Sequence, residues 1–378
     1  MTARLIPSPE EEELRASVRA FLERKSPEAE VRRLMISADG FDRDVWDQMA
    51  NQLGLQGLAV PERFGGSGFG FRELAIAVEE TGRALYTGPF FSSAVLATSL
   101  LLESGDEDAM AEWLPQLAGG QAIGTVALAA SVGLHRSPSE FSLTEQDGGV
   151  VLDGMIDYVS DAAAAEVILV AHCDDRGLSV VAVDGRDKSV RAVPLVNVDE
   201  TRRFASLTFD GTRGEVVGTL GGGEAWFSRA MDRSISALAV ECVGGAQKCL
   251  EMAVDYAKER FTFGRAIGSY QAIKHKCADM KIAVDAATAA AAWAVQESAE
   301  DGEALPSAAA LAKAYCPEAY FRVAGDNIQI HGGLGFTWEC PAHLYFKRAK
   351  ASELFLGSGA LYRKRLSQEL RENFQAAS

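Results

Sequence analysis

The segment KERFTFGRAIGSYQ, residues 258–271, combines charge and glycine in a way that could bind an anion. A helical pattern ends at Arg260, a loop containing two glycines follows, and a second helical pattern begins near Tyr270. The loop gathers Arg260, Arg265 and the free backbone N–H groups of the second helix, and all of these favour phosphate. The segment therefore indicates a phosphate or pyrophosphate site, although a plain helix–helix connection with solvated arginines fits the same pattern.

A second candidate, DNIQIHGGLGFTWECP, covers residues 326–341. Gln329 lies on a helical pattern that ends at the adjacent glycines Gly332 and Gly333. Glycines without side chains let a backbone approach a flat or charged ligand closely. A helix end followed by a loop gives the same pattern, so both interpretations stay open.

A third feature is the turn ELFLGSG, which joins two helical patterns near the C-terminus. Gly357 and Ser358 are typical of a turn that serves a site, but Leu356 precedes them. A leucine side chain can neither transfer a proton nor coordinate an ion.

Three zones of different pattern must position these segments. Residues 1–118 carry apolar residues at helical spacing, residues 119–222 form short β-branched or alternating runs, and residues 223–378 form long alanine-rich helical patterns. We expect an α+β multidomain protein with an N-terminal α-helical domain, a middle β-barrel or β-sandwich and a C-terminal four-helix bundle. The middle zone lacks GxGxxG and a strand–helix–strand rhythm, which excludes a Rossmann domain.

Composition narrows the function classes. The 378 residues include 48% hydrophobic and 24% charged residues, with a formal net charge of -16. An acidic chain of this length argues against nucleic-acid binding, and its uncharged runs are too interrupted for membrane spans. The six cysteines form no CxxC pair and the five histidines are scattered. We therefore expect a cytoplasmic protein with reduced thiols and no metal site.

The two glycine-containing segments resemble the acyl-CoA dehydrogenase family of flavoproteins. The family pattern of arginine, two residues, Phe-Gly and a later aromatic-Gln pair is matched by Arg260, Phe263, Gly264, Tyr270 and Gln271. Its later pattern of Gln, two residues and Gly-Gly-x-Gly-Phe is matched by Gln329, Gly332, Gly333, Gly335 and Phe336. The stretch FGGSGFGFRELAIAVEETGRAL resembles the family's N-terminal domain, so the likeness covers nearly the whole chain.

The resemblance implies a CoA thioester substrate and FAD held at a subunit interface. In the family a carboxylate in a dry cleft removes an α-proton, and a hydride passes from the β-carbon to the flavin. Tyr158 and Ser160 match an aromatic and a hydroxyl residue on the strand behind the flavin. The cofactor-binding residues implied are Arg260, Phe263, Gln271, Gln329, Gly332, Gly333, Tyr158, Ser160 and Ser358.

The sequence departs from the family at the base. Leu356 occupies the position where most members carry the catalytic glutamate, and Ala130-Ser131-Val132 stands where a Thr-Glu-Pro loop is usual. Some relatives carry the base on the helix that opens the third zone, at the position of Ser234. Glu241 and Asp232 are the candidates nearby. Each also fits a structural role, Glu241 as a buried acid held by a partner and Asp232 as an ion-paired acid.

The resemblance leaves three alternatives for the complete enzyme. The chain is most similar to the base-lacking chain of bacterial α2β2 acyl-CoA dehydrogenases, in which a homologous chain supplies the glutamate. Some of these complexes act on CoA thioesters of steroid side chains or other bulky acids. The second alternative is a self-sufficient homotetramer that uses Glu241 or Asp232, and the third is a non-catalytic acyl-CoA-binding or scaffold homologue.

Overall fold

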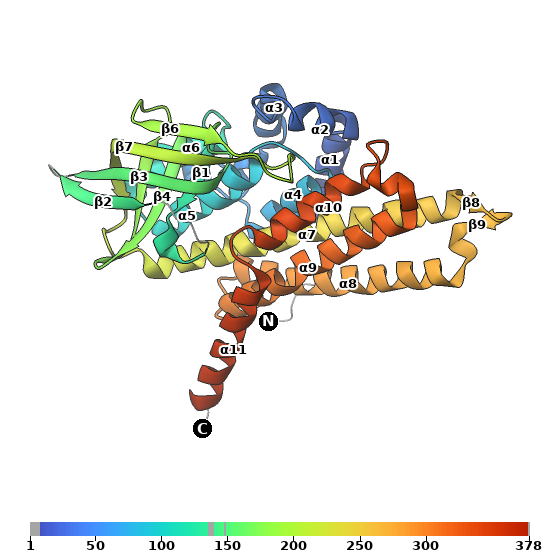
Figure 1. The fold of residues 1–378 in the computed structure, drawn as a ribbon. Coiled ribbons are helices and arrows are strands. Elements are labelled where there is room, and N and C mark those ends of the chain that lie inside the picture. The colour runs from blue at the N-terminus through green and yellow to red at the C-terminus, as the bar shows by residue number, and fades with distance from the viewer. Residues whose placement is uncertain (1–7, 135–139, 147–148, 377–378) are drawn as a thin grey trace. The chain divides into compact units, whose positions relative to one another are not determined.

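The computed structural model describes residues 8–134, 140–146 and 149–376, and it shows helices, then strands, then helices (Figure 1). Helices run as far as Ala118, strands occupy Gly124 to Val217, and long helices begin at Glu224. This order confirms the expected fold class. A turn that the sequence indicates at Asp147-Gly148 lies outside the described residues.

The first zone consists of short helices with recognisable end signals. Ser8 caps the first helix, since its hydroxyl accepts the Glu11 N–H while the Glu11 carboxylate accepts the Ser8 N–H. Gly54 ends the third helix in the left-handed conformation, at φ 62°. The helices are α1 (Pro9–Lys25), α2 (Glu28–Met35), α3 (Arg43–Leu53), α4 (Phe71–Arg83), the π-helix η3 (Phe91–Ala97), α5 (Thr98–Ser104) and α6 (Glu107–Ala118).

The middle zone forms one seven-stranded sheet among the described residues. Its strands are β1 (Gly124–Leu128), β2 (Phe141–Gln146), β3 (Gly149–Ser160), β4 (Val167–Asp174), β5 (Gly177–Asp184), β6 (Val190–Pro194) and β7 (Phe204–Val217). The order is β1-β4-β5-β7-β3-β2, with β6 also on β7, and only β1 and β4 are parallel. Leu152, Ile156, Val181, Leu207 and Phe209 are buried in its core.

The third zone consists of long helices that pack through small residues. They are α7 (Glu224–Glu259), α8 (Gln271–Ala299), α9 (Leu305–His331), α10 (Ala342–Leu354) and α11 (Gly359–Ala376). A two-stranded hairpin, β8 (Phe261–Thr262) and β9 (Arg265–Ala266), joins α7 to α8. Ala283, Ala287, Ala291 and Ala294 of α8 are buried, which allows close helix packing.

The chain packs as two compact units that do not follow the sequence zones. Unit 1 combines residues 1–31, 75–86 and 235–378, and unit 2 combines residues 32–74 and 87–234. The second half of α4 therefore belongs to unit 1 together with most of α7. The domain limits at residues 118 and 222 stay a prediction. No helix in the described part of the chain is long and apolar enough to cross a membrane.

Candidate functional site

The hairpin between α7 and α8 holds the predicted phosphate loop in a defined shape. Its two strands pair Phe261 with Ala266, and Phe263 and Gly264 form the tip with φ values of 52° and 78°. The Ile267 N–H donates to the Arg260 carbonyl at 2.8 Å, which closes the base of the loop. The loop is therefore closed by hydrogen bonds of its own backbone.

An aromatic clamp braces the second strand of this hairpin. The Arg265 guanidinium lies 4.0 Å from the ring centroid of Tyr270, and the Tyr270 hydroxyl donates to the Thr262 carbonyl at 3.0 Å. Arg265 is thus partly engaged within the hairpin, whereas Arg260 makes no ion pair or side-chain hydrogen bond within the described residues. Of the two arginines, Arg260 is the one whose guanidinium is available to an anion.

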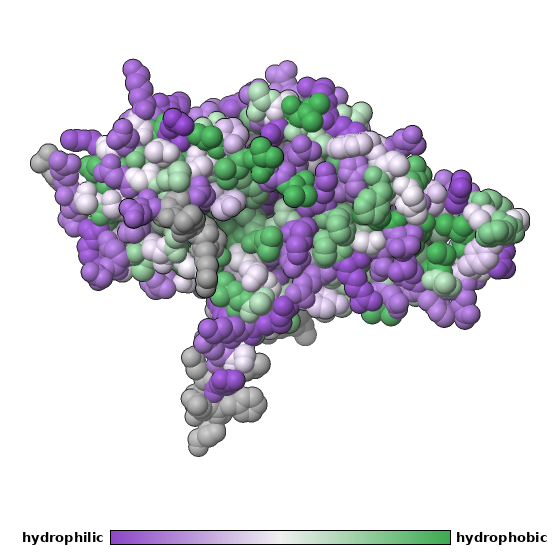
Figure 2. All heavy atoms as spheres, viewed as in Figure 1, coloured by the Kyte–Doolittle hydropathy of each residue, from purple (hydrophilic) through white to green (hydrophobic). Residues whose placement is uncertain are grey.

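The tip of the hairpin exposes aromatic surface. Phe263 is 93% exposed and Phe261 is largely exposed as well. Figure 2 shows this apolar tip, at the right-hand end of the view, among polar side chains. Aromatic residues presented on a braced hairpin are typical of a surface that contacts another molecule.

The glycine segment after α9 lies at the same end of the helices as the hairpin. The rings of Tyr256 on α7 and His331 on α9 stack at a centroid distance of 4.2 Å, about one turn before Arg260. The Lys276 Nζ lies 2.5 Å from the Asp326 carboxylate, which joins the start of α8 to the end of α9. The structure therefore brings the two segments together, with Gln271 and Gln329 at this end.

Gly332 and Gly333 border open space. Gly332 has a φ of 62°, which favours glycine. A Cβ atom added at either glycine would meet no other atom within 4 Å. The backbone of this turn is thus accessible to a ligand from outside, as the resemblance requires of a dinucleotide-binding turn.

Tyr158 and Ser160 lie in the other unit, on β3, where the pairing with β7 is irregular between Ile156 and Val159. Tyr158 has a φ of 61° and is 61% exposed. The Ser160 hydroxyl is buried and has no hydrogen-bond partner among the described residues. An unsatisfied buried hydroxyl costs about 1–3 kcal/mol, so this position fits a hydrogen bond to a bound cofactor.

The turn after α10 has a strained backbone at Leu356, the position where the resemblance expects the base. Leu356 is buried and has a φ of 57°, and Gly357 follows with a φ of 98°. The Tyr362 hydroxyl donates to the Leu356 carbonyl at 2.6 Å. Ser358 is exposed. The turn is therefore held in one conformation even though its first residue has no chemical group for proton transfer.

A buried lysine supports the end of α10, directly before this turn. Lys313, on α9, is 1% exposed, and its ammonium donates to the carbonyls of Ser352 and Glu353 at 2.9 and 3.2 Å. These carbonyls belong to the last turn of α10, where the helix dipole is negative. Sequence reasoning missed Lys313, although a lysine inside the alanine-rich run PSAAALAKAY was a visible signal.

Of the two acids considered as alternative bases, Glu241 is held in an ion pair. Its carboxylate lies 3.3 Å from the Arg348 guanidinium, and the two side chains are 7% and 4% exposed. A Cβ added at Gly82 of α4 would lie 2.2 Å from the Glu241 carbonyl oxygen, so the two helix backbones touch here. This is the role of a buried acid held by a partner. No pattern in the sequence pointed to Arg348 as that partner.

The second acid, Asp232, lies in unit 2 although it is on the same helix. It is buried and takes part in polar interactions. Ser234, at the position of the alternative base, is fully buried and donates to the Ala230 carbonyl at 2.8 Å. At the position of the alternative base, α7 therefore carries a serine whose hydroxyl bonds to the backbone of the same helix.

The loop that departs from the family pattern after β1 forms the short helix η4 (Ala130–Val132). The Ser131 hydroxyl accepts the Cys173 N–H at 3.0 Å and lies 3.1 Å from the Nδ1 of His172. Burial lowers the pKa of His172, which the Asp174 charge raises in part. The hydroxyl thus joins this loop to β4.

Comparison with known proteins identifies the family of the two helical zones of the chain. The family models for the acyl-CoA dehydrogenase N-terminal and C-terminal domains match residues 8–121 and 221–370. The acyl-CoA dehydrogenase IpdE2 of Mycobacterium tuberculosis is 33% identical over 98% of this chain and 100% of its own length.

Two solved structures with similar folds carry paired chain names. The ChsE4-ChsE5 complex from Mycobacterium tuberculosis matches with a TM-score of 0.87 and 27% identity over 97% of this chain and 98% of that chain. The Tcur3481-Tcur3483 steroid ACAD variant matches with a TM-score of 0.86 and 27% identity over 98% and 99%. The chain belongs to the acyl-CoA dehydrogenase family.

Proposed function

We propose that the chain is one subunit of an FAD-dependent acyl-CoA dehydrogenase whose catalytic glutamate is supplied by a homologous partner chain. The reaction is the α,β-dehydrogenation of a CoA thioester. The observation that carries the proposal is the turn at Leu356. It keeps a strained and doubly supported conformation while an apolar side chain stands at the position of the base.

The state of the other acids supports the same conclusion. A general base must be free to take a proton from the substrate. Glu241 is instead bound to a buried guanidinium, and releasing it would break this buried ion pair. A self-sufficient enzyme would need Glu241 to leave this ion pair or would need Asp232 to act from its buried position. A base on a second chain needs neither change.

The relatives support a two-chain assembly and a substrate class. One matching structure is a complex of ChsE4 with ChsE5, and another, Tcur3481-Tcur3483, pairs two names in the same way and is called a steroid ACAD. We extend the proposal to an α2β2 assembly that acts on the CoA thioester of a bulky acid, with steroid-derived acids as the first class to test.

Members of this family are FAD-dependent, and bound FAD supplies the acceptor for the hydride. The residues fit the cofactor in two places. Arg260 offers a guanidinium for the pyrophosphate beside the accessible backbone of Gly332 and Gly333, while Ser160 offers an unsatisfied buried hydroxyl. In this proposal Phe263, Gln271 and Gln329 line the dinucleotide, and Tyr158 and Ser358 lie toward the flavin. Leu356 excludes water from the reacting carbons.

Expression of the chain alone and with a homologous glutamate-bearing chain tests the proposal. We expect the chain alone to lack turnover, and the co-expressed pair to copurify, bind FAD and dehydrogenate a CoA thioester. Replacing the partner's glutamate by glutamine should abolish turnover in the pair without loss of FAD. A yellow, active homotetramer of this chain alone would overturn the proposal.

A single substitution tests the role of the hairpin in cofactor binding. Arg260→Ala should lower the FAD content of the purified complex, because it removes a charge-assisted contact to the pyrophosphate. Arg265→Ala, which removes the arginine that stacks on Tyr270, is the matched control and should lose less FAD. Equal FAD content in wild type and Arg260→Ala would refute the role given to Arg260.

A further inference from the structure

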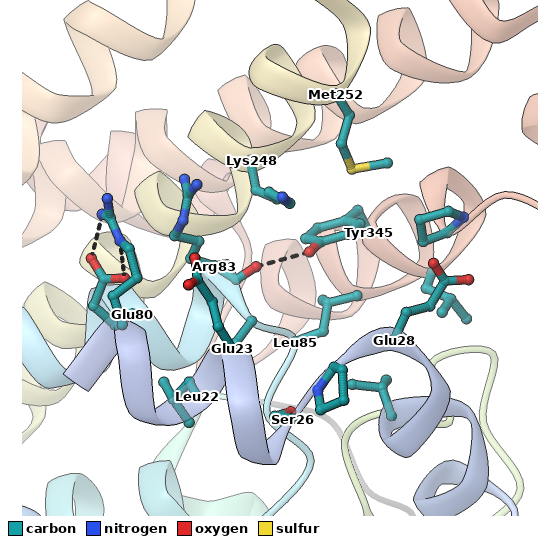
Figure 3. Close-up of a pocket in the computed structure, with 16 residues that line it drawn as sticks. Leu22, Glu23, Ser26, Glu28, Glu80, Arg83, Leu85, Lys248, Met252 and Tyr345 are labelled. Atoms are coloured by element: carbon teal, nitrogen blue, oxygen red, sulfur yellow. Dashed lines mark hydrogen bonds and ion pairs between the residues drawn. The ribbon is translucent and has the colours of Figure 1, made fainter. Parts of the chain in front are cut away.

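A cavity of about 300 Å³ lies within unit 1, apart from every residue considered above for the cofactor or the base. It is lined by α1 and the start of α2, the end of α4, the last third of α7 and the start of α10 (Figure 3). Its volume is at the lower end of the range of small-molecule sites. Nothing in the proposed dehydrogenation uses this cavity.

The cavity has an apolar floor. Leu22, Val31, Leu85 and Leu344 line it and are buried, and Met252 is half-buried on the wall formed by α7. The Tyr345 ring lies beside them, with its hydroxyl satisfied by the Arg83 carbonyl at 2.8 Å. An aliphatic or aromatic ligand body would lose water contacts on this surface without leaving a protein polar group unpaired.

The polar lining of the cavity carries three cationic side chains, Arg19, Arg83 and Lys248, and three acidic ones, Glu23, Glu28 and Glu80. The Arg83 guanidinium donates two hydrogen bonds to the Glu251 carboxylate, which leaves further N–H groups for another acceptor. Lys248 lies one turn before Glu251 and makes no ion pair or hydrogen bond within the described residues. Arg83 and Lys248 both act on Glu251, which is not among the residues that line the cavity.

The pKa of Glu251 reflects the charges of Arg83 and Lys248. Burial on its own would raise the pKa of Glu251, but hydrogen bonds from Arg83 and Gln247 and the charges of Arg83 and Lys248 hold it below its ordinary value. The other arginine of the lining, Arg19, is already neutralised by a two-pronged ion pair with Glu80, at 2.7 and 2.8 Å. Among the lining cations, Lys248 is thus the one that makes no ion pair within the described residues.

We infer that this cavity binds a carboxylic acid with a medium-length apolar body, the carboxylate meeting Lys248 and Arg83 and the body lying on Leu22, Leu85 and Met252. Glu23 and Glu28 also line the cavity, with Glu23 next to Arg83 in Figure 3, and their charges would disfavour a second negative charge on the ligand. The site therefore selects a monoanion over a dianion. The inference does not depend on the proposed two-chain reaction.

Binding of octanoate to the purified full chain, as the complex if the partner is needed for solubility, tests the inference by isothermal titration. We expect saturable binding of octanoate, with octylamine and acetate at least about tenfold weaker, because the first reverses the charge and the second lacks the body. Lys248→Met should weaken octanoate about tenfold or more, and Lys248→Arg should retain binding. Lys188→Met, at an exposed lysine of unit 2, is the control and should change nothing.

The same variants separate this cavity from the acyl site of the proposed enzyme. Octanoate bound only in an acyl cleft would be insensitive to Lys248→Met, and that result would overturn the inference. Equal or tighter binding of octylamine would also overturn it, because the acids would then dominate the cavity. Met252→Gln, which makes the α7 wall polar without touching a charge, should weaken octanoate but not alter the weak binding of acetate.

Discussion

The ion pair between Glu241 and Arg348 offers the sharpest test of the mechanism, because the two roles proposed for Glu241 predict opposite results. The side chains are 7% and 4% exposed and 3.3 Å apart, so neither charge has solvent to replace its partner. Removing one member of such a pair costs about 3–5 kcal/mol, mainly because the other charge stays buried and unpaired. We expect Arg348→Met to fall in this range. Glu241→Gln should be less severe, because the amide oxygen can still accept a hydrogen bond from Arg348.

The double variant Glu241→Gln/Arg348→Met removes both charges. Replacing a whole buried pair by neutral groups is often neutral or stabilising, so we expect the double variant to be more stable than Arg348→Met alone. Urea unfolding followed by far-UV circular dichroism measures the stability of wild type, the two single variants and the double variant, which together form a double-mutant cycle. Additive losses, with the double variant the least stable of the four, would refute the structural role of this pair.

The second readout of the same variants is catalysis. In the complex with the partner chain, we expect Glu241→Gln to reduce flavin with a CoA thioester at a rate within about threefold of wild type. If Glu241 were the general base, the rate would fall by a factor of about 10²–10⁴ in protein that still binds FAD. Stopped-flow measurement of flavin absorbance distinguishes the two outcomes.

Four further predictions concern the end of α10, a histidine and two glycines. Lys313→Met should lower the free energy of unfolding by about 1–3 kcal/mol, because two carbonyls of α10 lose a buried donor. The control is Lys364→Met, at an exposed position of α11, which should be within about 0.5 kcal/mol of wild type. Urea unfolding measures both variants. The pKa of His172 is lowered in the folded state, so its stabilising contribution is present above a pH of about 6.5 and is lost as the pH falls through the folded pKa. The free energy of unfolding of His172→Gln should therefore change less with pH between about pH 7 and pH 5 than that of wild type. One histidine can contribute at most about 1.4 kcal/mol per pH unit to this slope, and a slope equal to that of wild type would contradict the prediction. Gly244→Ala should destabilise the fold by more than about 3 kcal/mol, because its Cβ would lie 2.0 Å from the Glu79 carbonyl oxygen. Gly333→Ala should keep the stability of wild type but lower the FAD content, since its Cβ would enter only the open space proposed for the cofactor.

Local sequence patterns were sufficient to predict the order of helices and strands. Helical spacing, capping residues such as Ser8 and alternating apolar residues are properties of neighbouring positions, so they can be read without the fold. The hairpin after α7 and the glycine turn after α9 were also visible as local motifs. That these two motifs meet follows from the antiparallel packing of helices, which the lengths of the helical patterns already suggested.

The grouping of the helices depends on contacts that local patterns do not encode. Gly82 and Gly244 let α4 and α7 touch at their backbones, and this crossing joins the second half of α4 to unit 1. Arg348 lies 107 positions from Glu241, and a charge within an ordinary helical pattern gives no sign of its partner. The cavity at Lys248 draws its lining from five helices, so it exists only after these have packed.

If the proposed two-chain enzyme is correct, the turn at Leu356 keeps a defined shape without carrying the catalytic residue. A leucine in the left-handed region costs about 1–2 kcal/mol, and glycine would remove that cost. The Tyr362 hydroxyl nevertheless holds the turn at the Leu356 carbonyl, and the Lys313 ammonium holds the end of the helix that precedes it. If the turn served only to present a base, a chain without that base would have no use for such support. A requirement for the shape of the turn and for an apolar side chain explains both the supporting hydrogen bonds and the leucine. This requirement is expected if the turn forms part of the wall around flavin and substrate while a residue of another chain takes the substrate's proton.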